Sequence, residues 1–272
     1  MERSPDSSCP QLLVSVRSAA EAREALAGGC DILDVKEPRH GSLGAASASV
    51  ICDVADVGSE AGVAVSSALG ECIDWKQSAP LDPGSVQKAE LRFVKLGLAG
   101  MGDRDHWSSE WLDVIVRCSR KLPAGSRHVA VIYADWQAAR APHPQAILDA
   151  VSEQLRTEKS DATFAGVLID TFEKSSGRLL DAMSLEMLRE IREQTSQMGQ
   201  FLALAGRLNE ESLSKLVDLA PDIVAVRSAA CRGEDRNASV DREAVSTFRV
   251  AMQSHFEPSL RAAPASGGAT HV

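Results

Sequence analysis

Short apolar segments alternate with helix-like stretches along the whole chain of 272 residues, and this alternation constrains the fold more than any other feature. The segments are rich in Val, Ile, Leu and Ala and lack the polar alternation of a half-exposed sheet. Continuous apolar runs of this kind are typical of parallel strands that are buried on both faces. The predicted strands span 12–16, 32–36, 62–66, 93–98, 128–133, 166–170, 201–205 and 223–227.

Helical patterns fill the gaps between these runs. Ser18 precedes Glu21 by three residues, which is the spacing of a capping box, while Ser184 and Asn209 are favourable N-cap residues. Strictly alternating strands and helices predict a parallel sheet, and eight is the number of strands that closes into a barrel. The predicted helices span 19–27, 46–57, 83–90, 107–121, 144–156, 184–198, 209–219 and 242–253.

A doubly wound open sheet is the alternative architecture. No GxGxxG motif follows the first predicted strand, and the Gly41-Ser42-Leu43-Gly44 loop does not have the spacing of a phosphate loop, so the open sheet is disfavoured. We therefore predict an α/β protein with a single (β/α)8 TIM barrel over residues 11–255. Residues 1–10 are expected to be flexible, and the small, polar, proline-bearing residues 256–272 to be a disordered tail.

Composition narrows the classes of partner. The formal net charge of −9, with no basic run, disfavours nucleic-acid binding. No apolar stretch approaches the ~20 residues of a membrane span, and the polar start lacks the core of a signal peptide. The six cysteines show no metal-ligand spacing, so we predict no metal site and a reducing, cytoplasmic location. Barrels often associate, so a homo-oligomer is compatible with this interpretation.

The second predicted strand carries an acid and a lysine on one face. Side chains alternate along a strand, so Asp34 and Lys36 point the same way as Ile32, toward the interior of a barrel. Buried charges are costly unless they are paired or used. Because desolvation lowers the pKa of an amine, a lysine in such a place is a candidate nucleophile.

Five charged residues fall at or near the ends of predicted strands two, four and six, where barrel enzymes place their sites. A lysine that forms an imine, a second lysine and a carboxylate that moves a proton make up aldolase-type chemistry. Each of these charged residues could instead have a structural role, as a solvated loop lysine or as an aspartate that caps a loop. The candidate catalytic residues are Asp34, Lys36 as the Schiff-base lysine, Lys95, Asp170 and Lys174.

The last two predicted strands end in an anion-site pattern. Small residues let backbone N–H groups approach an anion, arginine adds donors, and barrels commonly bind phosphate after strands seven and eight. Ordinary glycine turns with exposed arginines are the alternative. The candidate phosphate- or substrate-binding residues are Gly206, Arg207, Arg227, Ser228 and Ala229. Tyr133, the only tyrosine, either lines the site or fills space.

A specific block combines Asp34-Val35-Lys36 and Pro38 with Gly41-Ser42-Leu43-Gly44. Further blocks follow in order over roughly residues 11–250: 12–16, 94–98, 169–171, 203–206, 227–231, 235–237 and 241–242. Together they resemble the (5-formylfuran-3-yl)methyl phosphate synthase family, which begins the furan moiety of methanofuran. The chain departs from the family pattern at Arg207 and Ser228, both in the predicted phosphate loops.

The resemblance implies a TIM barrel that condenses two glyceraldehyde 3-phosphate molecules into a furan aldehyde phosphate, with loss of phosphate and water. It implies that Lys36 forms the Schiff base, that Asp34, Lys95, Asp170 and Lys174 assist, and that no cofactor is needed. The partner would be a phosphorylated triose, and the enzyme a carbon–oxygen lyase acting on phosphates. Fold alone leaves open another Schiff-base aldolase, a phosphosugar isomerase or a non-catalytic phosphometabolite-binding barrel.

Overall fold

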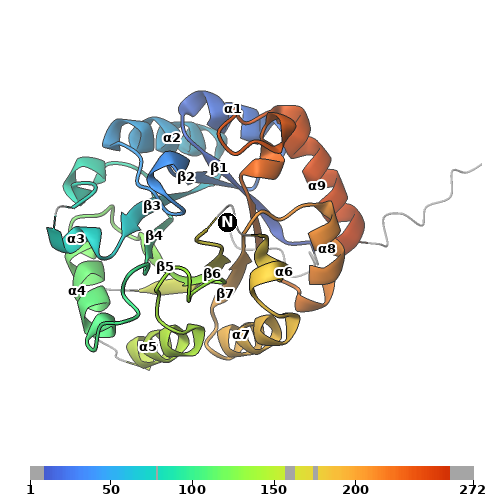
Figure 1. Ribbon diagram of the computed structural model, residues 1–272. Coiled ribbons are helices and arrows are strands. Elements are labelled where there is room, and N and C mark those ends of the chain that lie inside the picture. The colour runs from blue at the N-terminus through green and yellow to red at the C-terminus, as the bar shows by residue number, and fades with distance from the viewer. Residues whose placement is uncertain (1–8, 78, 157–162, 174–176, 258–272) are drawn as a thin grey trace, which may run out of the picture.

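The computed structural model describes residues 9–77, 79–156, 163–173 and 177–257. Eight parallel strands form a closed barrel in sequence order, with β8 paired to β1. Figure 1 looks along the barrel axis and shows helices around the outside of the strands. The predicted barrel is therefore confirmed. Its strands are β1 (Gln11–Val16), β2 (Ile32–Val35), β3 (Ala64–Glu71), β4 (Phe93–Gly97), β5 (Arg127–Tyr133), β6 (Phe164–Asp170), β7 (Phe201–Leu204) and β8 (Ile223–Val226).

Three α-helices begin where the predicted N-cap residues Ser18, Ser184 and Asn209 place them. The hydroxyl of Ser18 accepts a hydrogen bond from the backbone N–H of Glu21 at 3.2 Å, and Asn209 caps its helix through Ser212 at 3.1 Å. The helices are α1 (Ala19–Ala27), α2 (Ala48–Ala61), α3 (Asp74–Gln77), α4 (Trp107–Ser119), α5 (Pro144–Arg156), α6 (Leu179–Ala182), α7 (Leu185–Gln197), α8 (Glu210–Leu216) and α9 (Arg242–Phe256). Short 3-10 turns are η1 (Pro38–His40), η2 (Pro83–Val86), η3 (Val217–Leu219), η4 (Ser228–Ala230) and η5 (Arg232–Glu234).

Several predicted elements differ in extent from the observed ones, and two of them were clearly wrong. The segment 83–90 forms only the turn η2, because Gly84 is a weak helix former and Asp82 accepts a hydrogen bond from its backbone N–H at 3.2 Å. Strand β3 runs to Glu71 instead of ending at Ser66. Its Ser, Ala and Gly residues have low strand propensity, and pairing with β2 and β4 overrides that preference.

The core has two layers that follow the strand alternation. Leu12 and Leu33 pack in the larger layer between strands and helices, whereas Leu13 and Ile32 belong to the smaller cluster inside the barrel. Burying each such side chain stabilises the fold by roughly 1.5–3 kcal/mol. Phe93 and Phe201, at the starts of β4 and β7, meet edge to face with ring centroids 5.3 Å apart. Apolar side chains therefore fill the N-terminal end of the barrel.

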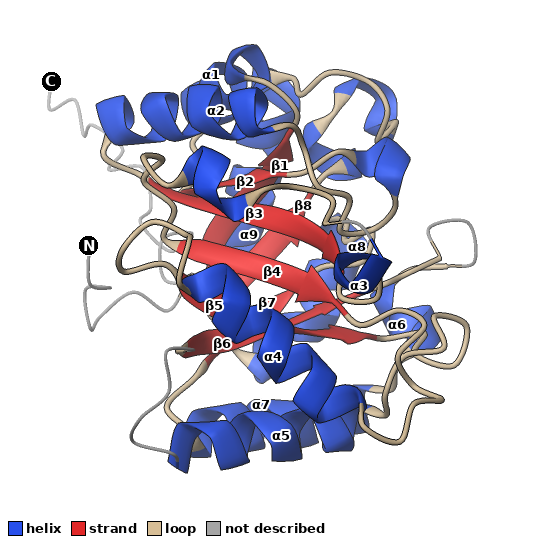
Figure 2. Ribbon diagram, turned by 90° about the vertical axis from the view of Figure 1, so that its left-hand side faces the viewer, coloured by secondary structure: helices blue, strands red, loops and turns tan. Residues whose placement is uncertain are grey.

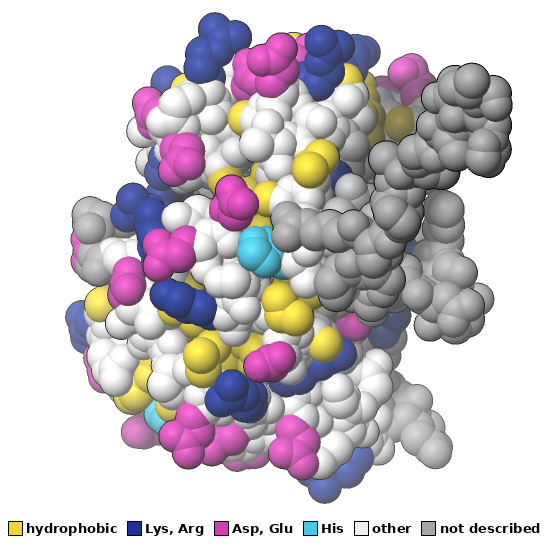
Figure 3. All heavy atoms as spheres, turned by 90° about the vertical axis from the view of Figure 1, so that its right-hand side faces the viewer, with side chains coloured by type: hydrophobic (Ala, Val, Ile, Leu, Met, Phe, Trp, Pro, Cys, Tyr) yellow, Lys and Arg dark blue, Asp and Glu magenta, His cyan; other side chains and the backbone are white. Residues whose placement is uncertain are grey.

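The opposite end carries the loops that follow the strands. In Figure 2 the arrowheads of β3 and β4 point toward this end, which we call the mouth, and α3 and α6 lie beside it. On the outer face shown in Figure 3, acidic and basic side chains are interspersed. No helix of the described residues is long and apolar enough to cross a membrane. The six cysteines form no disulfide, and the described residues hold no cluster of three or more metal-ligating side chains.

Candidate active site

Both charges of the Asp-Val-Lys motif are buried, one on strand β2 and one directly after it. Asp34 is 2% exposed and Lys36, directly after the strand, is 8% exposed. Ile32 lies in the inner apolar cluster, whereas Leu33 and Val35 pack outward against the helices. The alternation of the strand therefore points Asp34 inward, above an apolar layer that excludes water.

Asp34 is the centre of a buried polar network. Its Oδ1 accepts a hydrogen bond from Ser66 Oγ at 2.8 Å and forms an ion pair with Lys95, and its Oδ2 accepts from Ser15 Oγ at 3.0 Å. Strand register brings Ser15, Asp34 and Ser66 side by side on β1, β2 and β3. Because Lys95 is only 3% exposed, each charge compensates the other in a region that water does not reach.

Asp170 ends β6 on the other side of the mouth. Its Oδ1 accepts the backbone N–H of Thr171 at 2.8 Å, and its Oδ2 lies 3.2 Å from Ser42 Oγ. The Ser42 hydroxyl is also 2.9 Å from the carbonyl of Thr171. Ser42 belongs to the Gly-Ser-Leu-Gly block, so that block reaches from β2 across to β6. Lys174 lies outside the described residues.

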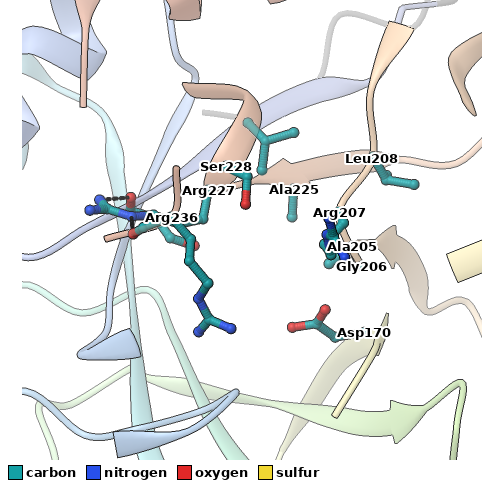
Figure 4. Close-up of a pocket in the computed structure, with 11 residues that line it drawn as sticks. Asp170, Ala205, Gly206, Arg207, Leu208, Ala225, Arg227, Ser228 and Arg236 are labelled. Atoms are coloured by element: carbon teal, nitrogen blue, oxygen red, sulfur yellow. Dashed lines mark hydrogen bonds between the residues drawn. The ribbon is translucent and has the colours of Figure 1, made fainter. Parts of the chain in front are cut away.

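A cavity of about 430 Å³, including its part open to solvent, adjoins Asp170 at the mouth. The loops after β7 and β8 form much of its wall, including Gly206 and Ser228 (Figure 4). Gly206 has φ +103°, a conformation that favours glycine. In the described part of the chain, the backbone N–H groups of Ser228 and Ala229 donate to no other backbone carbonyl.

Arg227 also lines the cavity, but its guanidinium binds protein. A guanidinium has five N–H donors, and here they reach the carbonyls of Arg236, Ala238 and Ser15 and both carboxylate oxygens of Glu21, at 2.6–3.3 Å. This arrangement leaves no donor for an anion and does not support the expected phosphate contact. Arg227 instead ties the loop after β8 to α1. Arg207 lines the cavity with φ +55° and an exposed side chain.

A family model described as 4-HFC-P synthase matches residues 12–249, which contain every strand from β2 to β8 and most of β1. The chain belongs to the 4-HFC-P synthase family. Proteins named (5-formylfuran-3-yl)methyl phosphate synthase are similar along nearly their whole length. That of Methanococcus maripaludis strain S2 is 37% identical over 84% of this chain and 92% of its own. That of Methanocaldococcus jannaschii is 32% identical over 88% of this chain and 97% of its own.

Solved structures similar to this 4-HFC-P synthase family member are barrels of low sequence identity. KGPDC from Streptococcus mutans superposes with a TM-score of 0.54 at 13% identity, covering 91% of this chain and 99% of that one. Phosphoribosyl anthranilate isomerase from Thermotoga maritima gives a TM-score of 0.54, also at 13% identity, covering 90% and 99%. At such identity these similarities support the fold alone.

Arg236 is a site residue that the residue-by-residue analysis missed. It lies in one of the sequence blocks shared with the 4-HFC-P synthase family and lines the same cavity as Asp170. In Figure 4 its side chain extends into the cavity and its guanidinium faces the Asp170 carboxylate. Within the described residues, its side chain donates one hydrogen bond, from Nη2 to the carbonyl of Pro38 at 3.2 Å. Ser15, Ser42 and Ser66 were also missed, because a serine in a strand or glycine loop carries no distinctive signal.

A half-buried acid, Glu71, and the single tyrosine complete the mouth. Tyr133 is fully buried and donates a hydrogen bond to Glu71 Oε1 at 2.5 Å, and the backbone N–H of Ala99 donates to Oε2 at 2.9 Å. Burial raises the pKa of Glu71 despite these two bonds. Burial, together with the nearby Glu71 carboxylate, raises the pKa of Tyr133 well above its ordinary value. A Cβ at Gly97 would lie 2.1 Å from Glu71 Oε2, so the acid occupies the space that this glycine leaves.

Proposed function

We propose that this chain is a (5-formylfuran-3-yl)methyl phosphate synthase, which condenses two glyceraldehyde 3-phosphate molecules through an imine at Lys36, in methanofuran biosynthesis. The names of its relatives support the reaction. The observation that carries the proposal is the burial of Asp34, Lys36, Lys95 and Asp170 at one mouth, beside a cavity. Lysines are seldom buried to this degree without a partner or a use.

The first steps use the lysine and one acid. The amine of Lys36 adds to a triose carbonyl and water leaves, giving an imine that serves as an electron sink. Asp170 then takes the proton from the adjacent carbon. Asp170 suits this role better than Asp34, because Asp34 is already bound by two hydroxyls and an ammonium, whereas Asp170 lines the cavity.

Loss of that proton expels the phosphate from the next carbon and leaves an enol conjugated with the imine. The terminal carbon of this enol attacks the carbonyl carbon of the second triose phosphate, in its ketone form after isomerisation, and forms the new carbon–carbon bond. A hydroxyl of the second triose closes the ring on the carbon next to the imine, loss of two waters gives the furan, and hydrolysis of the imine releases the formyl group and the Lys36 amine. The atoms balance when two trioses yield one furan aldehyde phosphate, one inorganic phosphate and two waters. Lys95 and Lys174 would transfer protons or offset phosphate charge. The reaction is that of a carbon–oxygen lyase acting on phosphates.

The phosphate that stays on the product would bind between the loops after β7 and β8. The backbone N–H groups of Ser228 and Ala229 supply donors, and Gly206 keeps the facing wall free of a side chain. Arg207 adds positive charge at the rim. A cytoplasmic location fits both phosphorylated metabolites and six reduced cysteines.

Incubation of the purified chain with glyceraldehyde 3-phosphate alone tests the proposal. We expect a furan absorbance band and one inorganic phosphate per furan, and borohydride should fix substrate mass on the peptide that contains Lys36. A six-carbon sugar product without phosphate release would indicate a plain aldolase. Absence of both product and adduct would leave a binding protein and overturn the synthase assignment.

A further inference from the structure

The proposed reaction brings two phosphate groups to one mouth, and the loops after β7 and β8 account for one of them. A second dianion beside Asp170, in a protein of net charge −9, requires a counter-charge within the cavity. Among the described residues that line the cavity, Arg207, Arg227 and Arg236 are cationic. Arg227 has all its donors occupied by protein, and Arg207 has an exposed side chain, which leaves Arg236.

Arg236 has the geometry of an unsaturated anion ligand. Its half-buried side chain reaches into the cavity, and one hydrogen bond, to the Pro38 carbonyl at 3.2 Å, occupies a single donor of its guanidinium. Planar forked donors match phosphate oxygens. Pro38 is two residues beyond Lys36, so an anion on this guanidinium would lie next to the segment that carries the proposed imine.

Arg17, Glu21 and Arg227 form a largely buried clamp that holds the main chain of residues 236–238. Arg227 donates to the carbonyls of Arg236 and Ala238, and Arg17 donates to those of Asn237 and Ala238. Glu21 pairs with both arginines at 2.6 Å. Burial alone raises the pKa of Glu21, but the hydrogen bonds from Arg227 and Arg17 lower it below its ordinary value.

We propose that Arg236 binds the second substrate phosphate, the one that the reaction expels, and that the Arg17–Glu21–Arg227 clamp positions Arg236. This inference rests on the proposed function. Developing charge on the leaving phosphate would strengthen its bonds to a preorganised guanidinium. The two anion sites then differ in kind. Backbone N–H groups hold the phosphate that is retained, and a side chain holds the one that is lost.

Three variants test the assignment. We expect Arg236→Ala to lower kcat/KM for furan formation about 100-fold, and Arg236→Lys about tenfold because the charge remains but the fork is lost. Arg232→Ala is the matched control, since Arg232 lies in the same loop, with 85% of its side chain exposed, and pairs only at the surface with Asp241. It should stay within about twofold of the parent.

Two further measurements separate phosphate binding from a purely structural role. Inorganic phosphate should raise the melting temperature of the parent chain more than that of Arg236→Ala, because a ligand stabilises the state that binds it. If Arg236 only neutralised Asp170, the variant would lose rate but keep the full phosphate shift. Borohydride trapping with unphosphorylated glyceraldehyde should mark Lys36 equally in both proteins.

The inference is overturned by a furan-forming kcat/KM of Arg236→Ala within about twofold of the parent, or by an undiminished phosphate shift. Failure of the proposed function has a different signature, in which the parent chain itself forms no adduct and no furan. In that case the phosphate shift still decides whether Arg236 is an anion ligand. Glu21→Gln tests the clamp, because loosening residues 236–238 should raise KM more than it changes trapping at Lys36.

Discussion

The two halves of the barrel mouth use similar residues in opposite ways. On the β1–β4 side, Asp34 is fully bound by Ser15, Ser66 and Lys95, and little of the group contacts solvent. On the β6–β8 side, Asp170 faces a cavity whose walls include backbone donors and the largely unbound guanidinium of Arg236. The polar groups of the first half bond to one another, whereas the second half has hydrogen-bond donors that are available to a ligand.

This difference separates preorganisation from binding. A buried polar network that is fully satisfied becomes rigid, and it holds charge at a fixed place. Donors that lack a protein partner are the ones available to a ligand. In the sequence, Lys36 lies between the two halves. Asp34, two residues before it, belongs to the satisfied network, and the carbonyl of Pro38, two residues after it, accepts the hydrogen bond from Arg236.

The largest expected effect comes from the lysine where the halves meet. Lys36→Ala and Lys36→Arg should each reduce furan formation by about 10⁴-fold or more, because neither side chain can form an imine. Circular dichroism and the melting temperature should remain close to those of the parent. A Lys36→Arg enzyme with appreciable turnover would show that charge at this position, and not a covalent bond, is what catalysis needs.

Exchange of each aspartate for asparagine tests the contrast directly. Asp170→Asn should lower kcat about 10²- to 10⁴-fold, as loss of a general base does, with little change in stability. Asp34→Asn should lower the free energy of unfolding by about 3–5 kcal/mol, because Lys95 loses its buried counter-charge. Denaturant titration and single-turnover rates measure the two effects. Equal stability losses in the two variants would erase the distinction between the halves.

Neighbouring serines on β3 sharpen the comparison at smaller scale. Ser66→Ala removes a hydrogen bond to the Asp34 carboxylate and should cost about 1.5–3 kcal/mol of stability. Ser67, the matched control, is also buried, but among the described residues its hydroxyl bonds only to the carbonyl of Ala68, at 3.3 Å. Ser67→Ala should therefore cost less in urea titrations, and a larger loss there than at Ser66 would contradict the network.

The smallest effect concerns the pH dependence of stability at Glu71. Since its pKa is raised in the fold above the ordinary value of 4.5, the folded chain holds this proton more tightly than the unfolded chain. Stability from this group is complete below pH 4.5 and declines as the pH rises toward the raised value. Glu71→Gln should flatten that decline in melting temperatures measured across pH, whereas substitution of the exposed Glu60 should not.

The strands and the inward face of β2 could be predicted because each depends on local pattern. Buried parallel strands appear as apolar runs, and the period of two assigns Asp34 and Lys36 to one side. The extension of β3 to Glu71 could not be predicted, because its residues favour no strand and only neighbouring strands order them. The burial of Glu71 beside Tyr133 follows from that extension.

The roles of the two arginines after β8 could not be predicted from the local sequence either, because they too depend on contacts with distant residues. Arg227 and Arg236 each follow a strand end in a loop of small and polar residues, and either could be a phosphate ligand. Their difference depends on Glu21, which is 206 residues before Arg227 in the chain and meets it only in the closed barrel. An acceptor supplied from the other end of the chain leaves no trace in the local sequence.

The amino-acid sequence by itself determined the eight-stranded barrel, the inward direction of Asp34, and membership in the 4-HFC-P synthase family. The periodicity of side chains and the order of motifs contain that information. Only the tertiary structure decided which charged groups are satisfied by protein and which remain open to a ligand. Hydrogen-bond partners are set by distances of a few ångströms between residues far apart in the chain, and those distances exist only once the barrel has closed.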